Sequence, residues 1–448
     1  MREDLITQLL IQLHNKANPE PTNKNSVLQK FAAPTEFVGL DDPATVTKRT
    51  KANFKWGGRI LGTFSRASVA YDDQGNLVAS GAPRFAPGAP GFGQALKSEE
   101  GTANVMGASA TDFSLWTRAD VTLTSGQSDP FGSTAATKAA KGVTTSPDPF
   151  YRYPGAQVAA GATVTYTASI WLRADAALTA PLVVYLAGVG AYAVNVSVTT
   201  QWQRFTFTQS LTNGLASAAN VGMGLRLANS TTVYVFRAQF EAKPYATSFA
   251  DGTRAAESFT IPTAGVLSAA EGNVEFHAWI PDGPQSYLFT VDGATDNRNR
   301  LFIYGTSTGS SDQAMRALMG DGTTSVVTPN IAVTRKAWHY FAVRWTATLL
   351  QFTVDTTTVQ IARSGWAPTF GASAYIGSSI GASQANAYID DLRISSRART
   401  DAEILAAYQS GAPLPWDEDT TCKLDFDGSL DSSAYLAPGW VWNSGEYK

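Results

Sequence analysis

The sequence has 448 residues, of which 44% are hydrophobic and 11% aromatic, so the chain can bury real cores and is long enough for two or three domains. It contains 34 Lys and Arg against 37 Asp and Glu, for a formal net charge of −3, and no stretch clusters the cations that a nucleic-acid or anionic-membrane surface needs. Composition and charge thus exclude a disordered chain and argue against direct binding of DNA or RNA.

Cysteine content and the first residues bear on the compartment. Cys422 is the single cysteine, which leaves no internal disulfide framework and no thiolate zinc site. The start, Met1-Arg-Glu-Asp-Leu5, places acids where a secretory signal carries only cations, and the run Leu9-Leu10-Ile11 is too short to span a bilayer. We expect synthesis in a reducing host cytoplasm, no membrane insertion, and an exit by a route other than secretion.

Residues 1–60 predict a short helix followed by an extended arm. The helix has an apolar stripe at i, i+3/i+4 spacing, formed by Leu5, Ile6, Leu9, Leu10 and Leu13. Pro19 and Pro21 end this pattern. Because so short a helix is unstable alone, it either docks onto another protein or packs onto its own chain.

Residues 61–255 predict an antiparallel β-sandwich. Val164, Tyr166 and Ile170 alternate with polar residues, and runs near Tyr192–Val198 and Val221–Leu227 repeat the pattern between Gly, Asn and Ser turns. Regularly spaced short strands are typical of sandwiches. The fold class is therefore expected to be mainly β, with tandem jelly rolls behind the N-terminal segment.

Residues 256–412 predict a second sandwich. Val274, Phe276 and Ile280 alternate with polar residues, and Asp251-Gly-Thr-Arg254 marks the boundary with the first. Thr400 and Glu403 have the spacing of a capping box for a short helix that Gly411 and Pro413 end. Residues 413–448 predict an aromatic tail with one extra strand at 420–430, which we expect to complete the preceding sandwich or to join a neighbouring subunit.

Two groups of motifs resemble parts of bacteriophage virion proteins. Thr63-Phe-Ser-Arg-Ala-Ser68 and Pro83-Arg-Phe85 resemble a lead-in segment of phage tail proteins. Asp112-Phe-Ser-Leu-Trp-Thr117, Val164–Trp171, Trp202–Thr206 and Ala238–Glu241 resemble the carbohydrate-binding-module-like jelly roll of such proteins. The resemblance implies a tail fibre or another surface appendage.

A third group of motifs resembles the concanavalin A-like, laminin G-like jelly roll. These motifs are Glu271–Phe276, Trp338–Phe341 and above all Tyr388-Ile-Asp-Asp-Leu-Arg-Ile394 with the helix after it. The resemblances together cover residues 60 to 412, so both ends are interpreted on physical grounds alone.

Catalytic constellations are scarce. The chain has three histidines, His14, His277 and His339. A Ser-His-acid triad or a multi-histidine metal site therefore has almost no candidate residues. The paired carboxylates Asp72-Asp73 and Asp390-Asp391 are adjacent in sequence, so in strands they point to opposite faces and make a poor acid/base couple for glycoside hydrolysis. We therefore expect no enzyme.

A calcium ion is the one cofactor considered. Asp292, Asp296 and Asn297 lie in one Asp/Asn-rich loop, and Ca²⁺ prefers such oxygen ligands. The same residues also stabilise turns through backbone hydrogen bonds, which is the favoured interpretation.

Sugar binding requires a flat aromatic surface with polar groups beside it. Trp171 leads the candidates because it lies on the polar-facing side of its strand with Arg173, followed by Trp202 and Tyr153 in the first domain and Trp279 and Trp366 in the second. Trp171 could instead pack under a loop or against the neighbouring domain.

These observations predict a virion structural protein that binds host-surface glycans. Residues 1–60 would attach it to other virion proteins, and the jelly rolls would project from the virion surface, with the chain expected as a homo-oligomer. Two alternatives stay open: a purely architectural decoration, collar or tail protein, and an accessory carbohydrate-binding protein of a bacterial glycan-active system.

Overall fold

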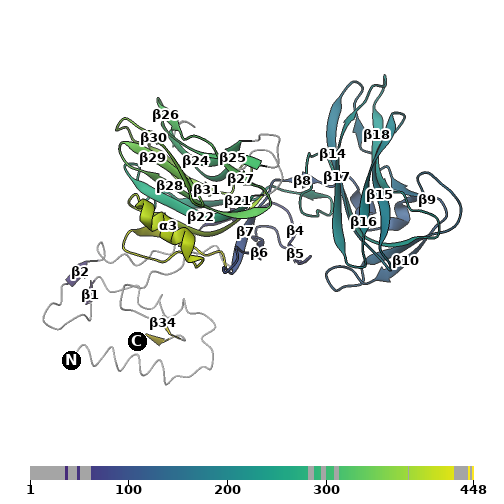
Figure 1. Ribbon diagram of the computed structural model, residues 1–448, viewed down its shortest axis with the longest axis horizontal. Helices are drawn as coiled ribbons and strands as arrows, with labels where there is room; N and C mark the ends of the chain where they lie inside the picture. The colour runs from purple at the N-terminus through teal and green to yellow at the C-terminus, as the bar shows by residue number, and fades with distance from the viewer. Residues whose placement is uncertain are drawn as a thin grey trace. The chain divides into compact units, whose positions relative to one another are not determined.

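The computed structural model describes residues 36–38, 48–50, 62–280, 287–293, 299–306, 312–381, 383–427, 442–443 and 446–447. One unit, Ile60–Ser433, holds two β-sandwiches (Figure 1). Outside it, β1 (Glu36–Val38) pairs with β2 (Lys48–Thr50), and β34 (Trp442–Asn443) pairs with β35 (Glu446–Tyr447). The helix expected near the N-terminus lies outside the described residues, so its docking role stays a prediction.

The first sandwich packs a five-stranded sheet against a six-stranded sheet. The five-stranded sheet has the order β10 (Val121–Gln127), β11 (Ala136–Lys141), β19 (Thr232–Glu241), β14 (Thr163–Ala174), β17 (Gln203–Thr212). The six-stranded sheet has the order β16 (Gly190–Val198), β15 (Leu178–Leu186), β18 (Ala219–Leu225), β12 (Phe150–Arg152), β9 (Thr117–Arg118), with β13 (Gln157–Val158) also on β18. Two 3₁₀ turns, Gly107–Ala110 and Phe113–Leu115, precede these strands.

The second sandwich packs two eight-stranded sheets. One, called here the loop-side sheet, has the order β26 (Ser325–Val327), β25 (Asp312–Asp321), β24 (Asn299–Thr306), β23 (Tyr287–Gly293), β31 (Phe370–Ile376), β21 (Ser258–Pro262), β3 (Thr63–Ser65), with β27 (Ile331–Thr334) on β25. The other, the helix-side sheet, has the order β30 (Thr357–Ala362), β29 (Leu349–Val354), β28 (Ala337–Trp345), β22 (Gly272–Ile280), β32 (Ala387–Ser395), β7 (Gln94–Ser98), β6 (Phe85–Pro87), with β33 (Thr420–Leu424) on β32.

Alternation along the strands fills both cores, as the sequence predicts. In β14, Ile170 and Leu172 are fully buried in the first core, and in β22, Phe276 and Ile280 are fully buried in the second. Side chains of successive strand residues point to opposite faces, so the residues between them face outward. The expectation of a mainly β protein with two antiparallel sandwiches is confirmed.

The lead-in segment belongs to the second sandwich rather than the first. β3 pairs with β21, with Phe64 opposite Phe259, and β7 pairs with β32, with Leu96 opposite Ile389. The short strands β8 (Thr102–Ala103) and β20 (Thr253–Arg254) then pair where the chain leaves and rejoins the second sandwich. The first sandwich is therefore an insertion between strands of the second, and the range 61–255 contains strands of both.

Helix α3 (Asp401–Ser410) and β33 complete the second sandwich. Thr400 accepts a hydrogen bond from the backbone N–H of Glu403, the Glu403 side chain reciprocates, and Gly411 ends the helix in the left-handed conformation. This confirms the predicted capping box. β33 pairs with β32, which confirms that the strand near residue 420 completes the preceding sandwich. Among the described residues, no helix has the length and apolarity needed to cross a bilayer.

Candidate functional site

Three of the predicted sugar-binding residues lie together on the outer face of the five-stranded sheet. Trp171 and Arg173 project from β14 on the side opposite to Ile170 and Leu172, and Trp202 stands just before β17. Because β17 pairs with β14 with Gln203 opposite Leu172, Trp202 arrives beside Arg173. The sandwich thus joins two segments that are about thirty residues apart in sequence.

Two phenylalanines connect the indole rings. Phe236 of β19 is the register partner of Trp171, and its ring centroid lies 6.4 Å from that of Trp202. Phe131 lies 5.5 Å from Trp171 and 6.0 Å from Phe236, edge-on in both cases. We call Phe131, Trp171, Trp202 and Phe236 the first aromatic surface. Phe236 is buried, whereas both Trp rings are half-buried and belong to neither hydrophobic core.

Charged groups border this surface. The Arg173 guanidinium lies 3.7 Å from the ring centroid of Tyr234 and 5.4 Å from that of Trp202. Arg173 also lies 3.9 Å from the carboxylate of Asp175, whose side chain is 61% exposed. A guanidinium that stacks on rings keeps its N–H groups free to donate at its edge, and an exposed carboxylate accepts. Together they offer hydrogen-bond partners for sugar hydroxyls beside apolar rings.

The indole N–H groups of the candidate tryptophans differ in their exposure to solvent. Across the described residues, the N–H groups of Trp171 and Trp202 have no protein partner and are not buried. The N–H of Trp366 also lacks a partner but is buried, and its ring packs on the second core with Arg363 at 4.8 Å. Trp366 is therefore placed as a packing residue, and it does not share a surface with Trp171.

The lead-in segment supports the first aromatic surface from behind. The ring of Tyr71 lies 4.1 Å from the Arg237 guanidinium, which in turn lies 5.2 Å from the Phe131 ring. Arg237 also donates a hydrogen bond to the carbonyl of Gly75 at 3.2 Å. This chain of contacts fixes Phe131, and through it Trp171, against the turn of the lead-in.

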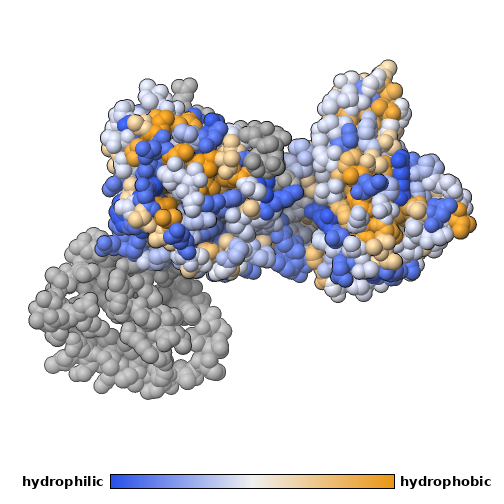
Figure 2. Space-filling view, in the orientation of Figure 1, coloured by the Kyte–Doolittle hydropathy of each residue, from blue (hydrophilic) through white to orange (hydrophobic). Residues whose placement is uncertain are grey.

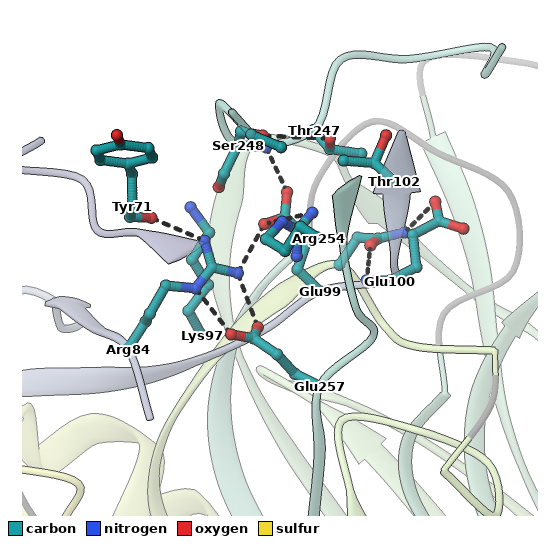
Figure 3. A network of polar contacts seen from close by, with 12 residues as sticks. Tyr71, Arg84, Lys97, Glu99, Glu100, Thr102, Thr247, Ser248, Arg254 and Glu257 are labelled. Carbon is teal, nitrogen blue, oxygen red and sulfur yellow. Dashed lines mark hydrogen bonds and ion pairs between the residues drawn. The ribbon is translucent and has the colours of Figure 1, made fainter. Parts of the chain in front are cut away.

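A buried polar network holds that lead-in in place (Figure 3). Arg84 binds both carboxylate oxygens of Glu257 at 2.8 Å and donates to Glu99 at 2.8 Å, while Arg66 donates to Glu257 at 2.7 Å. Arg84 also donates to the carbonyl of Tyr71, and the Arg254 guanidinium lies 3.2 Å from Glu99. We call Arg66, Arg84, Glu99, Arg254 and Glu257 the ionic clasp.

The Glu99 carboxylate of the clasp is charged inside the protein. Burial opposes ionisation of Glu99, but the surrounding cations Arg254, Lys97 and Arg84 hold the pKa of its carboxyl well below the usual range. Bidentate Arg–carboxylate pairs of this kind are geometrically specific. All five side chains are buried, and hydrogen bonds within the chain join Arg66, Arg84, Glu99 and Glu257. The Arg254 guanidinium lies 3.2 Å from Glu99 but donates no hydrogen bond to any described residue. The four hydrogen-bonded members hold the lead-in in place.

Tyr153 lies on the other sheet of the first sandwich. Its ring centroid is 5.6 Å from that of Tyr151 and 5.8 Å from that of Tyr185, and Gly222 beneath it has no room for a side chain. Tyr185 donates to Asp148 at 2.8 Å. Burial, with Tyr151 and Asp148 nearby, raises the pKa of Tyr153. The structure thus separates Tyr153 from Trp171, and a tyrosine cluster surrounds it instead.

In the second sandwich Trp279 faces outward, as its alternation predicts. Its ring centroid lies 5.3 Å from that of Tyr388 on β32, and Trp338 of β28 is its register partner. Alternation within single strands does not point to Trp338 and Tyr388 as binding residues, because their alignment with Trp279 depends on the register of three strands. Figure 2 shows apolar residues gathered in patches on the visible surface of both sandwiches.

Of the three residues predicted to bind calcium, the structure describes only Asp292. Asp292 ends β23 with both carboxylate oxygens buried and without a hydrogen-bond partner in the described part of the chain, and burial, partly offset by Arg300, raises its pKa to about 6. Asp296 and Asn297 lie outside the described residues. Among the residues that are described, no three His, Cys, Asp or Glu side chains converge on one point. The metal site stays a prediction.

A family match concerns part of the second sandwich. Residues 266–405 match the family described as the concanavalin A-like lectin/glucanases superfamily. No curated protein sequence matches the chain.

Among solved structures, a heptameric SAP-like pentraxin from Limulus polyphemus is 11% identical over 39% of this chain and 87% of its own, with a TM-score of 0.29. Tailspike protein 2 of Escherichia coli O157:H7 bacteriophage CAB120 is 10% identical over 39% of this chain, with a TM-score of 0.32, and this chain spans 27% of it. A CBM22 tandem domain from Paenibacillus barcinonensis is 9% identical over 69% of this chain and 99% of its own, with a TM-score of 0.23.

Similarities this low carry no function to the chain. The family match stands on its own sequence signal and covers most strands of the second sandwich, including Trp279, Trp338 and Tyr388. The second sandwich is therefore similar, over residues 266–405, to the concanavalin A-like lectin/glucanases superfamily.

Proposed function

We propose that this chain is a non-enzymatic glycan-binding protein of a bacteriophage virion. The observation that carries the glycan part is the first aromatic surface, where half-buried Trp171 and Trp202 flank Phe236 beside the Arg173–Asp175 pair. Aromatic rings with a polar edge suit the apolar face and the hydroxyls of a pyranose. The lectin-containing family that matches residues 266–405 supports the same class of ligand.

The proposed lack of catalysis is supported by the state of the best acid/base candidates. His277 lies between the rings of Phe92 and Tyr340, at 4.5 and 5.3 Å, and burial lowers its pKa to about 4. Asp390 and Asp391 are each 1% exposed and accept hydrogen bonds from the backbone N–H groups of Ala89 and Leu414. A perturbed pKa marks a functional site only where substrate can reach the group.

Glycan binding is tested on the full chain with an array of host-envelope polysaccharides and with Trp171→Ala. We expect saturable binding that weakens about tenfold or more, since hot-spot aromatics commonly cost more than the roughly 1.4 kcal/mol that a tenfold change requires. Val143→Ala truncates an apolar side chain that is 77% exposed elsewhere in the first sandwich; it is the matched control and should bind as the wild type does. Trp171→Phe, which keeps a ring against Phe131, guards against a folding defect.

A wild-type chain that binds no polysaccharide on the array would reject the glycan role. It would favour the architectural alternative, for which the ionic clasp and its rigid lead-in are suited. The virion assignment rests on the lead-in motif resemblance and has its own test. Antibodies against residues 62–427 should label intact particles in electron micrographs, and their absence from purified particles would refute it.

A further inference from the structure

Four side chains form a row across the outer face of the helix-side sheet. Trp338 of β28 is the register partner of Trp279 in β22, Trp279 that of Tyr388 in β32, and Tyr388 that of Lys97 in β7. Lys97, Trp279 and Tyr388 each adjoin a core residue of the opposite face, namely Leu96, Ala278 and Ile389. Trp338 lies two residues before Tyr340, which packs against Ile404 of α3 on the outer face. The row therefore points away from the core on four consecutive strands.

Other described segments cover the part of this face that lies beside the row. Helix α3 and the segment after it cover one part, where Ile404 and Leu414 pack on Tyr340 and Ala342. Phe92 covers His277, the next outward residue of β22. Trp279, Trp338 and Tyr388 lie beyond these covers and are only half-buried. The structure thus leaves three half-buried aromatic side chains beside the covered part of this sheet face.

The two ends of the row differ in whether their polar groups have hydrogen-bond partners. In the described part of the chain, the indole N–H groups of Trp279 and Trp338 have no protein partner and are not buried. At the other end, Asp73 accepts from the Tyr388 hydroxyl at 2.8 Å and from Lys97 at 2.6 Å, and the Lys97 ammonium lies 5.1 Å from the Tyr388 ring centroid. The charges of Lys97 and Asp73 balance, so this end of the row carries no net charge.

We propose that Trp338, Trp279 and Tyr388 form a second saccharide platform, which takes a neutral oligosaccharide lying across the strands. The inference rests on the proposed glycan-binding function and adds a site and a ligand class. Neighbouring strands lie about 4.8 Å apart, so the row from Trp338 to Lys97 extends over roughly 14 Å, longer than a single sugar ring. Among the described residues of the row, the one cation is Lys97, and its charge is paired with that of Asp73 rather than free for an acidic sugar. The indole N–H groups and the Lys97–Asp73 pair suit sugar hydroxyls.

Two saccharide platforms on one chain would raise the overall affinity for a polysaccharide that reaches both. The ionic clasp joins the lead-in, including β7 with Lys97, to the strands that enter and leave the first sandwich. A polysaccharide that is bound at one surface meets the other at a raised effective concentration, so overall affinity exceeds that of either surface alone.

The test measures binding of neutral and acidic oligosaccharides to the full chain by calorimetry. The variants are the pair Trp279→Ala/Trp338→Ala, the pair Trp171→Ala/Trp202→Ala, and all four together. We expect the first pair to weaken binding of neutral oligosaccharides about tenfold or more, with little dependence on salt, and the four together to abolish it. Ile380→Ala removes an apolar side chain that is 52% exposed elsewhere in the second sandwich and serves as the matched control.

The outcomes separate this inference from the function on which it rests. Retained neutral-oligosaccharide binding by Trp171→Ala/Trp202→Ala, lost on adding Trp279→Ala/Trp338→Ala, supports the second platform. Wild-type affinity in Trp279→Ala/Trp338→Ala, while Trp171→Ala/Trp202→Ala abolishes binding, overturns the second platform alone. A change of oligomeric state in Trp279→Ala/Trp338→Ala, without a change in glycan affinity, shows a protein interface and also overturns it. No binding by the wild type removes both proposals, and Trp279→Phe/Trp338→Phe checks folding.

Discussion

Buried ionisable residues in this protein differ in how far neighbouring groups compensate their charges. In the ionic clasp, Glu257 accepts hydrogen bonds from both Arg66 and Arg84, and Glu99 accepts one from Arg84. Asp390 is different, since its carboxylate is buried under the loop before β7 with one backbone donor, the N–H of Ala89 at 3.1 Å. An uncompensated buried charge is costly, so the neutral form is favoured.

Asp390 should make stability fall as pH rises. Burial, with the neighbouring carboxylates Asp391 and Asp427, raises its pKa from 3.8 to about 7, against the opposing effect of the Ala89 N–H. Between those values the folded chain holds a proton that the unfolded chain has lost, so this group costs stability as pH rises from about 4 to 7. We predict that Asp390→Asn is more stable than the wild type at pH 8 by on the order of 3 kcal/mol, with no gain at pH 4.

Urea unfolding of both proteins at several pH values checks this difference. The comparison between variant and wild type matters, because His277 has a lowered pKa and contributes the opposite slope between about 4 and 6.5. Asp391 is coupled to Asp390 through its charge, so the difference between the two proteins reports the titration of this pair of carboxyl groups. Stability curves that stay parallel from pH 4 to 8 would show that Asp390 titrates normally.

Single residues also show how far the sequence predicts a site. Alternation within one strand correctly placed Trp171, Arg173 and Trp279 on outward faces. It could not show that Tyr153 lies on the opposite sheet from Trp171, because sheet membership depends on distant pairing. Nor could it find the row of Trp338, Trp279 and Tyr388, since that row exists only through the register of three strands.

Among the elements, helix α3 is the one whose ends are most completely specified. Its N-cap Thr400 and Glu403 bond reciprocally, Glu403 also pairs with Arg397, and Ile404 packs into the cluster with Tyr340. These contacts satisfy backbone N–H groups that a helix start leaves without partners. Local signals of this kind lie within a few residues, which is why the sequence predicted this helix correctly.

Removing the cap should have a measurable cost. Thr400→Ala deletes the acceptor for the Glu403 backbone N–H, which lies 3.2 Å from the Thr400 hydroxyl. We expect the free energy of unfolding to fall by about 1 kcal/mol. Thr400→Ser keeps the hydroxyl and should stay close to the wild type. Equal losses in both variants, measured by urea unfolding, would assign the effect to the threonine methyl group instead.

The strands of the lead-in show the opposite case. β3 and β6 have three residues each. β3 pairs with β21, which lies far later in the sequence, whereas β6 pairs with β7 in a short hairpin. Nothing within such short segments distinguishes a strand of the first sandwich from one of the second. Their place followed only from the contacts Phe64–Phe259 and Leu96–Ile389.

At the scale of the whole molecule, the insertion of the first sandwich into the second determines which of the two can fold without the other. The second sandwich uses β3, β6 and β7 from before the insertion and β21 onward from after it. The first sandwich uses only strands between β9 and β19. The second sandwich is therefore discontinuous in sequence, while the first is a continuous segment.

This arrangement predicts that the first sandwich can be excised. β8 and β20 pair antiparallel, with Ala103 opposite Thr253, and the Asn104 N–H donates to the Gly252 carbonyl at 2.7 Å. The two ends of the insertion thus lie at hairpin distance, and an Asn-Gly turn between Ala103 and Thr253 matches the twist of such a pair. We expect the shortened chain to fold with the second sandwich and the ionic clasp intact.

Circular dichroism and cooperative urea unfolding of the shortened chain provide the measurement. The counterpart that begins at residue 256 has the same sandwich without β3, β6 and β7, so β21 and β32 lose their neighbours and Glu257 loses Arg66 and Arg84. Removing the partners of a buried charge costs about 3–5 kcal/mol, and exposed strand edges promote aggregation. The counterpart should therefore be unfolded or aggregated. If it folds as stably as the excised chain, the lead-in is dispensable and the second sandwich is self-sufficient.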